Sequence, residues 1–183
     1  MKVNILVLIL LAVSIHVSAQ KFATKIGHIK FYSKAPLEKI EAHNMQVNAA
    51  FDQQSGFFVF KVLMKSFEFE KALMQEHFNE NYIESDKFPN ATFLGKVTNF
   101  NEINFSKDGT YKVNVEGKLT LHGITKEVKE TGTFQPDKGK IFGKAIFNLL
   151  LSDYNIDVPG AVANNISKTV EITVEVVLEK INP

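Results

Sequence analysis

The sequence predicts an all-β protein with one short helix, built as an extended antiparallel β-barrel of about eight strands with an apolar lumen. Apolar and polar residues alternate over several strand-length stretches, and short polar turns separate them. Only the stretch that follows Ser66 carries a helical period. About eight strands close a barrel whose interior holds side chains or one small ligand. A two-sheet sandwich is the alternative architecture.

The chain begins with the pattern of a secretory signal peptide. Lys2 precedes an apolar run over residues 5–13, and small residues stand at 17–19. We expect a signal peptide over residues 1–19, one mature domain over residues 20–183, and a periplasmic or secreted location. An uncleaved anchor is the alternative, but the run is short against the roughly 20 residues of a membrane span. After cleavage we expect no stable membrane anchor.

Composition excludes several classes of function. Lysine and arginine total 21 against 20 acidic residues, and loss of Lys2 with the signal peptide leaves 20 against 20. A net charge near zero argues against binding to nucleic acid, which requires a basic surface. The chain contains no cysteine, which excludes thiolate chemistry. All of its basic residues are lysines, so no planar guanidinium is present to grip a phosphate.

The first half of the mature chain predicts three strands and then a helix. The strands span residues 25–32, 40–51 and 57–64, with a hairpin turn at 52–56. The third strand is apolar on both faces, which fits a wall with a lumen inside and a cover outside. Met74, Phe78 and Tyr82 then recur every four residues, so they stack on one face of a helix. We expect this helix to close or flank the mouth of the barrel.

The second half predicts strands alone. They span residues 91–100, 111–121, 125–134, 141–150 and 169–181. The stretch over 111–121 alternates most regularly, with Tyr111, Val113, Val115, Leu119 and Leu121 on one face. The Asp-Gly pair at 108–109 marks the turn that precedes it.

The residues show no pattern of a catalytic or metal-binding site. There is no G-x-S-x-G and no H-E-x-x-H, and the mature histidines (His28, His43, His77 and His122) are not paired in sequence. We therefore predict no catalytic residue, no metal ligand and no cofactor, and a protein that is not an enzyme.

The candidate ligand-binding residues fall in two groups. Phe57, Val59, Val113 and Val115 are expected to line the lumen, and Phe67, Phe69, Leu73, Met74 and Phe78 its mouth. His77 and Tyr82 are expected to act as polar handles for a ligand head group. For His77, packing or capping of the helix is the alternative role.

Several short motifs occur along the mature chain: Ser66-Phe67, Phe69, Leu73-Met74, His77-Phe78, Tyr82, the stretches 85–93 and 117–126, Gly95, and Ser152-Asp153-Tyr154-Asn155-Ile156. Together they resemble the YceI-like family of secreted bacterial proteins. The resemblance covers nearly the whole mature chain. It departs at Leu151, where many relatives carry arginine, and at Asn155, where they carry glycine.

The resemblance implies a lipocalin-like barrel that binds long polyisoprenoid chains or similar amphiphiles. The expected partner is therefore an isoprenoid- or lipid-like small molecule that the protein carries or sequesters. A non-enzymatic stress-response or protein–protein interaction module with a filled barrel is the alternative. The volume of the lumen distinguishes the two.

Overall fold

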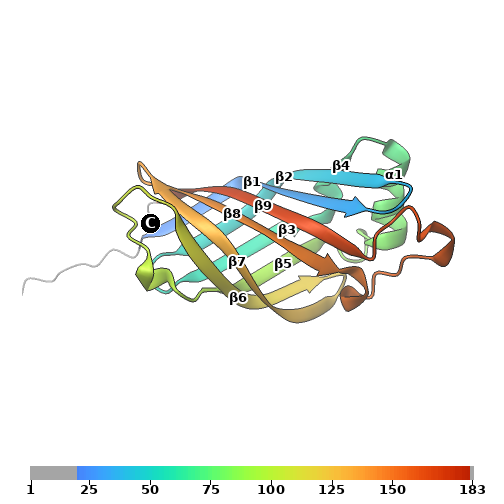
Figure 1. Ribbon diagram of the computed structural model, residues 1–183. Helices are drawn as coiled ribbons and strands as arrows, with labels where there is room; N and C mark the ends of the chain where they lie inside the picture. The colour runs from blue at the N-terminus through green and yellow to red at the C-terminus, as the bar shows by residue number, and fades with distance from the viewer. Residues whose placement is uncertain (1–19, 182–183) are drawn as a thin grey trace, which may run out of the picture.

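The computed structural model describes residues 20–181, which form a closed antiparallel barrel (Figure 1). Eight strands follow one another around the wall, and the pairing of β1 with β2 closes it. The predicted lipocalin-like barrel is thus confirmed, and the sandwich is excluded. The predicted signal peptide lies outside the described residues. The strands are β1 Lys21–Lys34, β2 Lys39–Asp52, β3 Phe57–Leu63, β4 Glu68–Phe69, β5 Asn90–Val97, β6 Tyr111–Leu121, β7 Ile124–Asp137, β8 Lys140–Leu150 and β9 Thr169–Ile181.

The wall beside β2 is built from two short strands in place of one long one. β3 pairs with residues 48–51 of β2, and β4 pairs with residues 42–43. The 3-10 turn η1 (Met64–Ser66) separates β3 from β4. The fully buried Asn44 bridges the interruption, because its Nδ2 donates to the Leu63 carbonyl at 2.8 Å. The Oδ1 of Asn44 accepts a hydrogen bond from the Gln46 backbone N–H at 2.9 Å. Both polar groups of this buried side chain therefore have partners.

The helical segment lies at one end of the barrel, beside the turn that joins β1 to β2 (Figure 1). It comprises α1 (Ala72–His77) and η2 (Phe78–Tyr82), and the second part is a π-helical turn. The helix predicted from the four-residue period is confirmed. Within residues 20–181, no helix has the length and apolar character needed to cross a bilayer. The remaining helical turns are η3 Phe100–Glu102, η4 Leu151–Tyr154 and η5 Gly160–Val162.

The end of the barrel that lies away from the helix is filled with side chains. Phe51, Phe58 and Phe134 pack edge to face, with ring centroids 5.2–5.7 Å apart. We name this group the far-end cluster. It contains Phe22, Ala49, Phe51, Phe58, Val97, Ile103, Val113, Phe134, Ile141, Val176 and Leu178.

Candidate functional site

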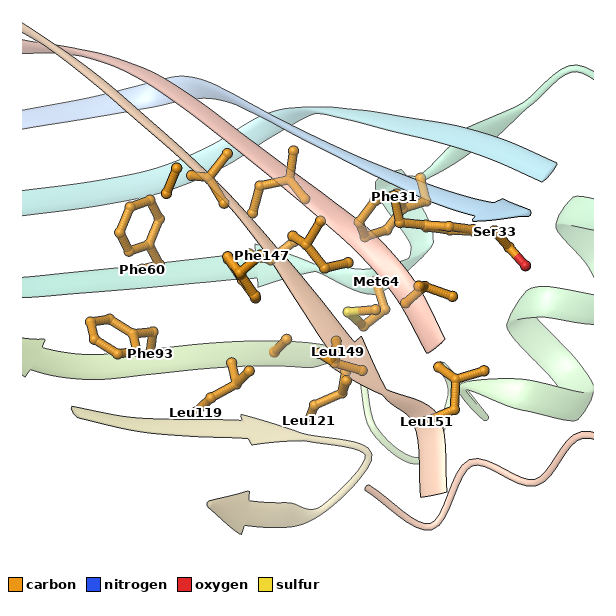
Figure 2. A pocket seen from close by; sticks show the side chains of 18 of the residues that line it. Phe31, Ser33, Phe60, Met64, Phe93, Leu119, Leu121, Phe147, Leu149 and Leu151 are labelled. Atoms are coloured by element: carbon orange, nitrogen blue, oxygen red, sulfur yellow. The ribbon is translucent and has the colours of Figure 1, made fainter. Parts of the chain in front are cut away.

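The half of the barrel nearer the helix encloses a cavity of about 500 Å³ (Figure 2). This volume lies within the range of roughly 300–1,000 Å³ that is common for ligand pockets. All eight strands of the wall contribute to its lining, and the side chains that do so are almost all apolar. The floor is formed by members of the far-end cluster, among them Phe58, Val113 and Phe134. The cavity is therefore a pocket with one filled end.

Cross-strand pairing explains why the lining is continuous. Phe60 of β3 pairs with Phe93 of β5, which in turn pairs with Leu119 of β6. Residues directly opposite in a sheet share a face, so all three point inward. Phe93 covers the facing pair Gly95 and Gly117, where a Cβ on Gly117 would meet the Gly95 Cα at 2.5 Å. The two glycines thus allow β5 and β6 to approach under the ring.

Four phenylalanine rings close the helix end of the cavity, and we name them the mouth cluster: Phe31, Phe67, Phe69 and Phe78. The Phe78 ring centroid lies 5.5 Å from that of Phe31, 5.6 Å from that of Phe67 and 5.0 Å from that of Phe69. Phe78 therefore attaches the helical segment to the barrel. Tyr82 lines the cavity one helical turn later, and burial raises the pKa of its hydroxyl.

The family profile described as the YceI-like domain matches residues 14–178 of this chain. The chain belongs to the YceI-like family. Solved structures with this fold share little sequence with it. A polyisoprenoid binding domain from Saccharophagus degradans, implicated in plant cell wall breakdown, is 14% identical with a TM-score of 0.76, over 89% of this chain and 99% of that one.

Two further solved structures resemble this YceI-like chain. BcnA of Burkholderia cenocepacia is 17% identical with a TM-score of 0.68, over 83% of this chain and 95% of that one. A YCEI protein of Campylobacter jejuni is 18% identical with a TM-score of 0.54, over 73% of this chain and 78% of that one. No curated protein matches the sequence significantly. At such identities the likeness shows the shared fold.

Most of the candidate residues of this YceI-like chain meet at the cavity. The structure brings together two residues of β6, two near β4 and four of the helical segment. Three other candidates, Phe57, Val59 and Leu73, do not line the cavity. The residues that do are Val113, Val115, Phe67, Phe69, Met74, His77, Phe78 and Tyr82.

The prediction for Phe57 and Val59 chose the wrong face of β3. Phe57 is 43% exposed and pairs with Lys96 on the outer surface of the barrel. The opposite set, which includes Phe58 and Phe60, faces the lumen. Both faces of this strand are apolar, so its own alternation does not distinguish inside from outside.

The prediction for Leu73 was also wrong. Leu73 precedes Met74 by one residue, which turns it about 100° away from the stripe that faces the barrel. Its side chain is 61% exposed. Met74, His77, Phe78 and Tyr82 carry the contact of the helical segment with the cavity.

Much of the lining was not named as a candidate from the sequence. Phe147 and Leu149 of β8 and Ile172 of β9 face the cavity together with Phe31 of β1 (Figure 2 labels the first two and Phe31). Their strands were predicted, and their inward parity follows from the alternation within each. Assigning them to one site required the register between strands, which a single sequence does not contain.

Glu130 of β7 brings a carboxyl group into a stretch of the lining that is otherwise apolar. Its neighbours on the inner face, Val128 and Gly132, are apolar. Burial raises the pKa of the Glu130 carboxyl. No motif in the sequence marks this position.

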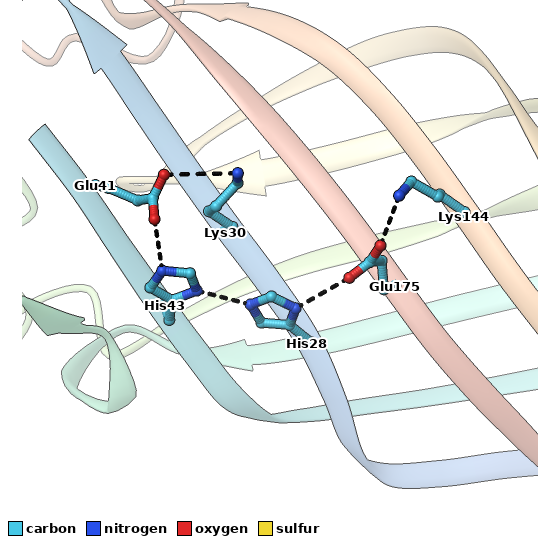
Figure 3. Close-up of polar contacts among 6 residues, drawn as sticks. All are labelled: His28, Lys30, Glu41, His43, Lys144 and Glu175. Carbon is cyan, nitrogen blue, oxygen red and sulfur yellow. Dashed lines mark hydrogen bonds and ion pairs between the residues drawn. The ribbon is translucent and has the colours of Figure 1, made fainter. Parts of the chain in front are cut away.

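Polar side chains form a chain across the outer wall of this YceI-like barrel (Figure 3). His43 Nε2 lies 2.9 Å from Glu41, His43 Nδ1 lies 2.9 Å from His28 Nε2, and His28 Nδ1 lies 3.3 Å from Glu175. The bond to His43 lowers the pKa of Glu41, and the bonds to Lys144 and His28 lower that of Glu175. Within residues 20–181, no three histidine or acidic side chains are placed to hold a metal ion. The chain of contacts connects four neighbouring strands.

His122 connects the turn after β6 to the segments around the mouth. It adopts a positive φ of 50° in the tight turn between β6 and β7. Its Nδ1 lies 3.0 Å from the Tyr154 carbonyl, and its Nε2 lies 2.9 Å from Glu84. The bond to His122 lowers the pKa of Glu84. His122 thus holds the exit of the helical segment and η4 close together.

The two departures from the family pattern have different structural consequences. Leu151 lines the cavity, so an apolar side chain stands where the family resemblance leads us to expect arginine. Asn155 adopts a left-handed conformation with φ of 54°, which glycine and asparagine tolerate best. Asn155 therefore keeps the backbone conformation that glycine would allow, whereas Leu151 changes the chemistry of the cavity lining.

Proposed function

We propose that this protein binds an amphiphilic small molecule with a long, polyisoprenoid-like apolar tail and carries or sequesters it outside the cytoplasm. The cavity of about 500 Å³, walled by apolar side chains from all eight barrel strands, carries this proposal. Its apolar lining suits a hydrocarbon chain more than a compact polar substrate. An open cavity also favours the carrier over an interaction module with a filled barrel.

Burial of the tail supplies enough free energy for useful affinity. Each buried methylene contributes roughly 0.8 kcal/mol, so a tail of about fifteen carbons contributes on the order of 10 kcal/mol before costs. Association costs an estimated 4–15 kcal/mol. The tail can therefore supply most of the binding energy without a charged clamp.

The absence of arginine shapes the proposal for the head group. All basic residues of the chain are lysines, and Leu151 stands at the cavity where many relatives carry arginine. We expect a neutral or weakly polar head, as in a quinone or a polyprenol, in preference to a tightly held diphosphate. The Saccharophagus degradans domain, whose structure is described as polyisoprenoid binding, supports the choice of tail.

The amino-terminal pattern supports the location. A signal peptide over residues 1–19 would export the domain that begins at residue 20. Export would place the protein in the periplasm or outside the cell. Amino-terminal sequencing of the mature protein tests this part of the proposal, with Gln20 as the expected first residue.

The proposal is tested by extracting lipids from the purified mature protein and identifying them by mass spectrometry. Recovery of neutral isoprenoids supports it, and recovery of diphosphate-headed lipids alone contradicts the head-group expectation.

A matched pair of variants tests the place of binding. Leu119→Trp would fill the cavity, whereas Leu94→Trp, on the neighbouring strand, would add the same ring to a side chain that is 56% exposed. Farnesol binding should weaken more than tenfold in the first and stay unchanged in the second.

A further inference from the structure

Glu130 places a carboxylate in the cavity with no partner from the protein. It lies on the inner face of β7, opposite Val115 of β6. Within residues 20–181, no hydrogen bond or ion pair reaches its side chain under ordinary distance limits. Burial raises the pKa of its carboxyl, which reflects the loss of water around the charge.

Ser33, Glu38 and Lys144, three other polar residues of the lining, differ from Glu130 in this respect, and the Lys144 ammonium donates to Glu175 at 2.7 Å. His77 and Tyr82 lie nearer the mouth, and their side chains likewise have no hydrogen-bond partner within residues 20–181. Ser33 Oγ accepts a hydrogen bond from the Ser167 backbone at 2.9 Å. The Glu38 carboxylate accepts from Lys71 at 2.9 Å and from Asn165 at 3.3 Å. Their hydrogen-bonding groups have partners within the fold, whereas the carboxyl group of Glu130 faces the lumen.

Glu130 also stands where the wall of the barrel opens. β7 pairs with β6 as far as Leu121–Ile124, but with β8 only between Gly132–Ala145 and Asp137–Lys140. Beyond Gly132 the two strands diverge toward the helix end (Figure 1). Both edges of this separation, Glu130 and Phe147, line the cavity.

A single ion pair crosses the separation nearer the helix. Lys126 Nζ donates to Asp153 at 2.5 Å, which ties β7 to η4. The ammonium of Lys126 is therefore directed to a carboxylate outside the lumen. Glu130 lies one layer deeper, four residues along the strand, at the base of the separation.

An unpaired, partly buried carboxylate has a clear chemical complement. Burial of a charge without a partner is unfavourable, and a hydrogen-bond donor in the ligand would remove that cost. Bonds from a hydroxyl to a carboxylate are charge-assisted, hence shorter and stronger than neutral ones. A phosphate at the same place would bring two negative charges together at low dielectric.

We propose that Glu130 is the head-group acceptor of the cavity and selects ligands whose polar end donates a hydrogen bond and carries no negative charge. A hydroxyl is the simplest such group. This inference rests on the proposed function, because it assigns the polar end of the same ligand. It places the head beside the separation of β7 and β8, with the tail among the apolar side chains.

Three probes with the same tail test the inference: farnesol, farnesyl methyl ether and farnesyl phosphate. The ether retains the oxygen but lacks the donor, and the phosphate adds negative charge. Their affinities are measured for the mature wild-type protein, Glu130→Leu, Glu130→Gln and Glu127→Gln. Glu127 is the matched control, because it carries the same charge on the exposed outer face of the same strand.

The wild-type protein should bind farnesol about tenfold or more tightly than the ether, the value expected for one bond to a charged acceptor. Glu130→Leu should bind farnesol less than about threefold more tightly than the ether. Its affinity for the ether should equal that of the wild type. Glu130→Gln should retain farnesol and bind the phosphate better than the wild type does. Glu127→Gln should behave as the wild type.

Equal affinity of the wild type for farnesol and the ether overturns the role of Glu130 and leaves the proposed function intact. An unchanged preference in a folded Glu130→Leu does the same. Failure of all three probes to bind overturns the proposed function itself. Circular dichroism of each variant establishes that a loss of binding is not a loss of folding.

Discussion

Truncation of Phe78 to alanine should release the helical segment from the barrel. The ring contacts three other members of the mouth cluster, at centroid distances of 5.0–5.6 Å. Removing a fully buried phenylalanine costs about 3–5 kcal/mol, and because Phe78 is only partly buried we expect about 2–3 kcal/mol. The strands pair with one another without the helix, so the cost should fall on the local stability of residues 72–83.

Amide hydrogen exchange measures this local stability directly. A loss of 2–3 kcal/mol corresponds to exchange that is about 30- to 160-fold faster in residues 72–83, with the strand amides little changed. Leu73→Ala is the control, because it removes a similar apolar side chain from the same helix at a position that is 61% exposed. The control should change stability by less than about 0.5 kcal/mol.

Similar exchange rates in the two folded variants would refute this reasoning. The helical segment would then be held by contacts other than the mouth cluster. Under the proposed function, Phe78→Ala should also speed the dissociation of farnesol, since the rings that close the cavity would separate. Stopped-flow dilution of the loaded protein measures that rate.

Three further predictions concern the wall. Gly117→Ala should destabilise the protein by about 1–3 kcal/mol in urea unfolding, because its Cβ meets backbone atoms at 2.5 Å, whereas Gly160→Ala, with open space around it, should be neutral. Glu175→Gln should lower the urea midpoint at pH 7. The pKa of Glu175 is lowered in the folded state, so the ionised carboxylate stabilises the fold above the ordinary pKa of 4.5. The difference in midpoint between the wild type and Glu175→Gln should therefore vanish as the pH falls through the pKa of the folded state. Glu130→Leu should raise the midpoint at neutral pH and lose this advantage in acid, because the raised pKa of Glu130 destabilises the folded state only where the carboxyl is ionised in the unfolded chain. Unchanged midpoints for Gly117→Ala, or pH-independent differences for either glutamate, would contradict these arguments.

The sequence predicted the barrel and its helix because each depends on local periodicity. The alternation over 111–121 places Val113 and Val115 inward whatever strands lie beside them. The spacing of Met74, Phe78 and Tyr82 likewise sets one face of a helix before its partner is known. Each pattern shows which residues share the buried face, and in the structure these residues lie on that face.

Where both faces of a strand are apolar, the sequence does not show which face points into the barrel. β3 carries phenylalanine at 57, 58 and 60, so either face fits a lumen by composition. The pairing of Phe57 with Lys96 and of Phe60 with Phe93 decides between them. That choice is made by the partner strand, which explains why Phe57 and Val59 were assigned to the wrong side.

The contacts of His28 and the lack of a partner for Glu130 depend on irregularities that no local pattern reveals. Register shifts in β1 around Gly27 set the position of His28 beside His43. The early end of the β7–β8 pairing leaves Glu130 at an opening. Each irregularity results from competition among several strands around a closed ring, which a single segment does not encode.

The far-end cluster leaves the cavity closed at one end. Phe51, Ile141 and Leu178 are almost fully buried there and fill the barrel beneath the floor. Under the proposed function, a bound molecule would therefore leave by the route through which it entered. A recipient membrane or protein would then have to meet the barrel at its helix-bearing half and would receive one molecule at a time.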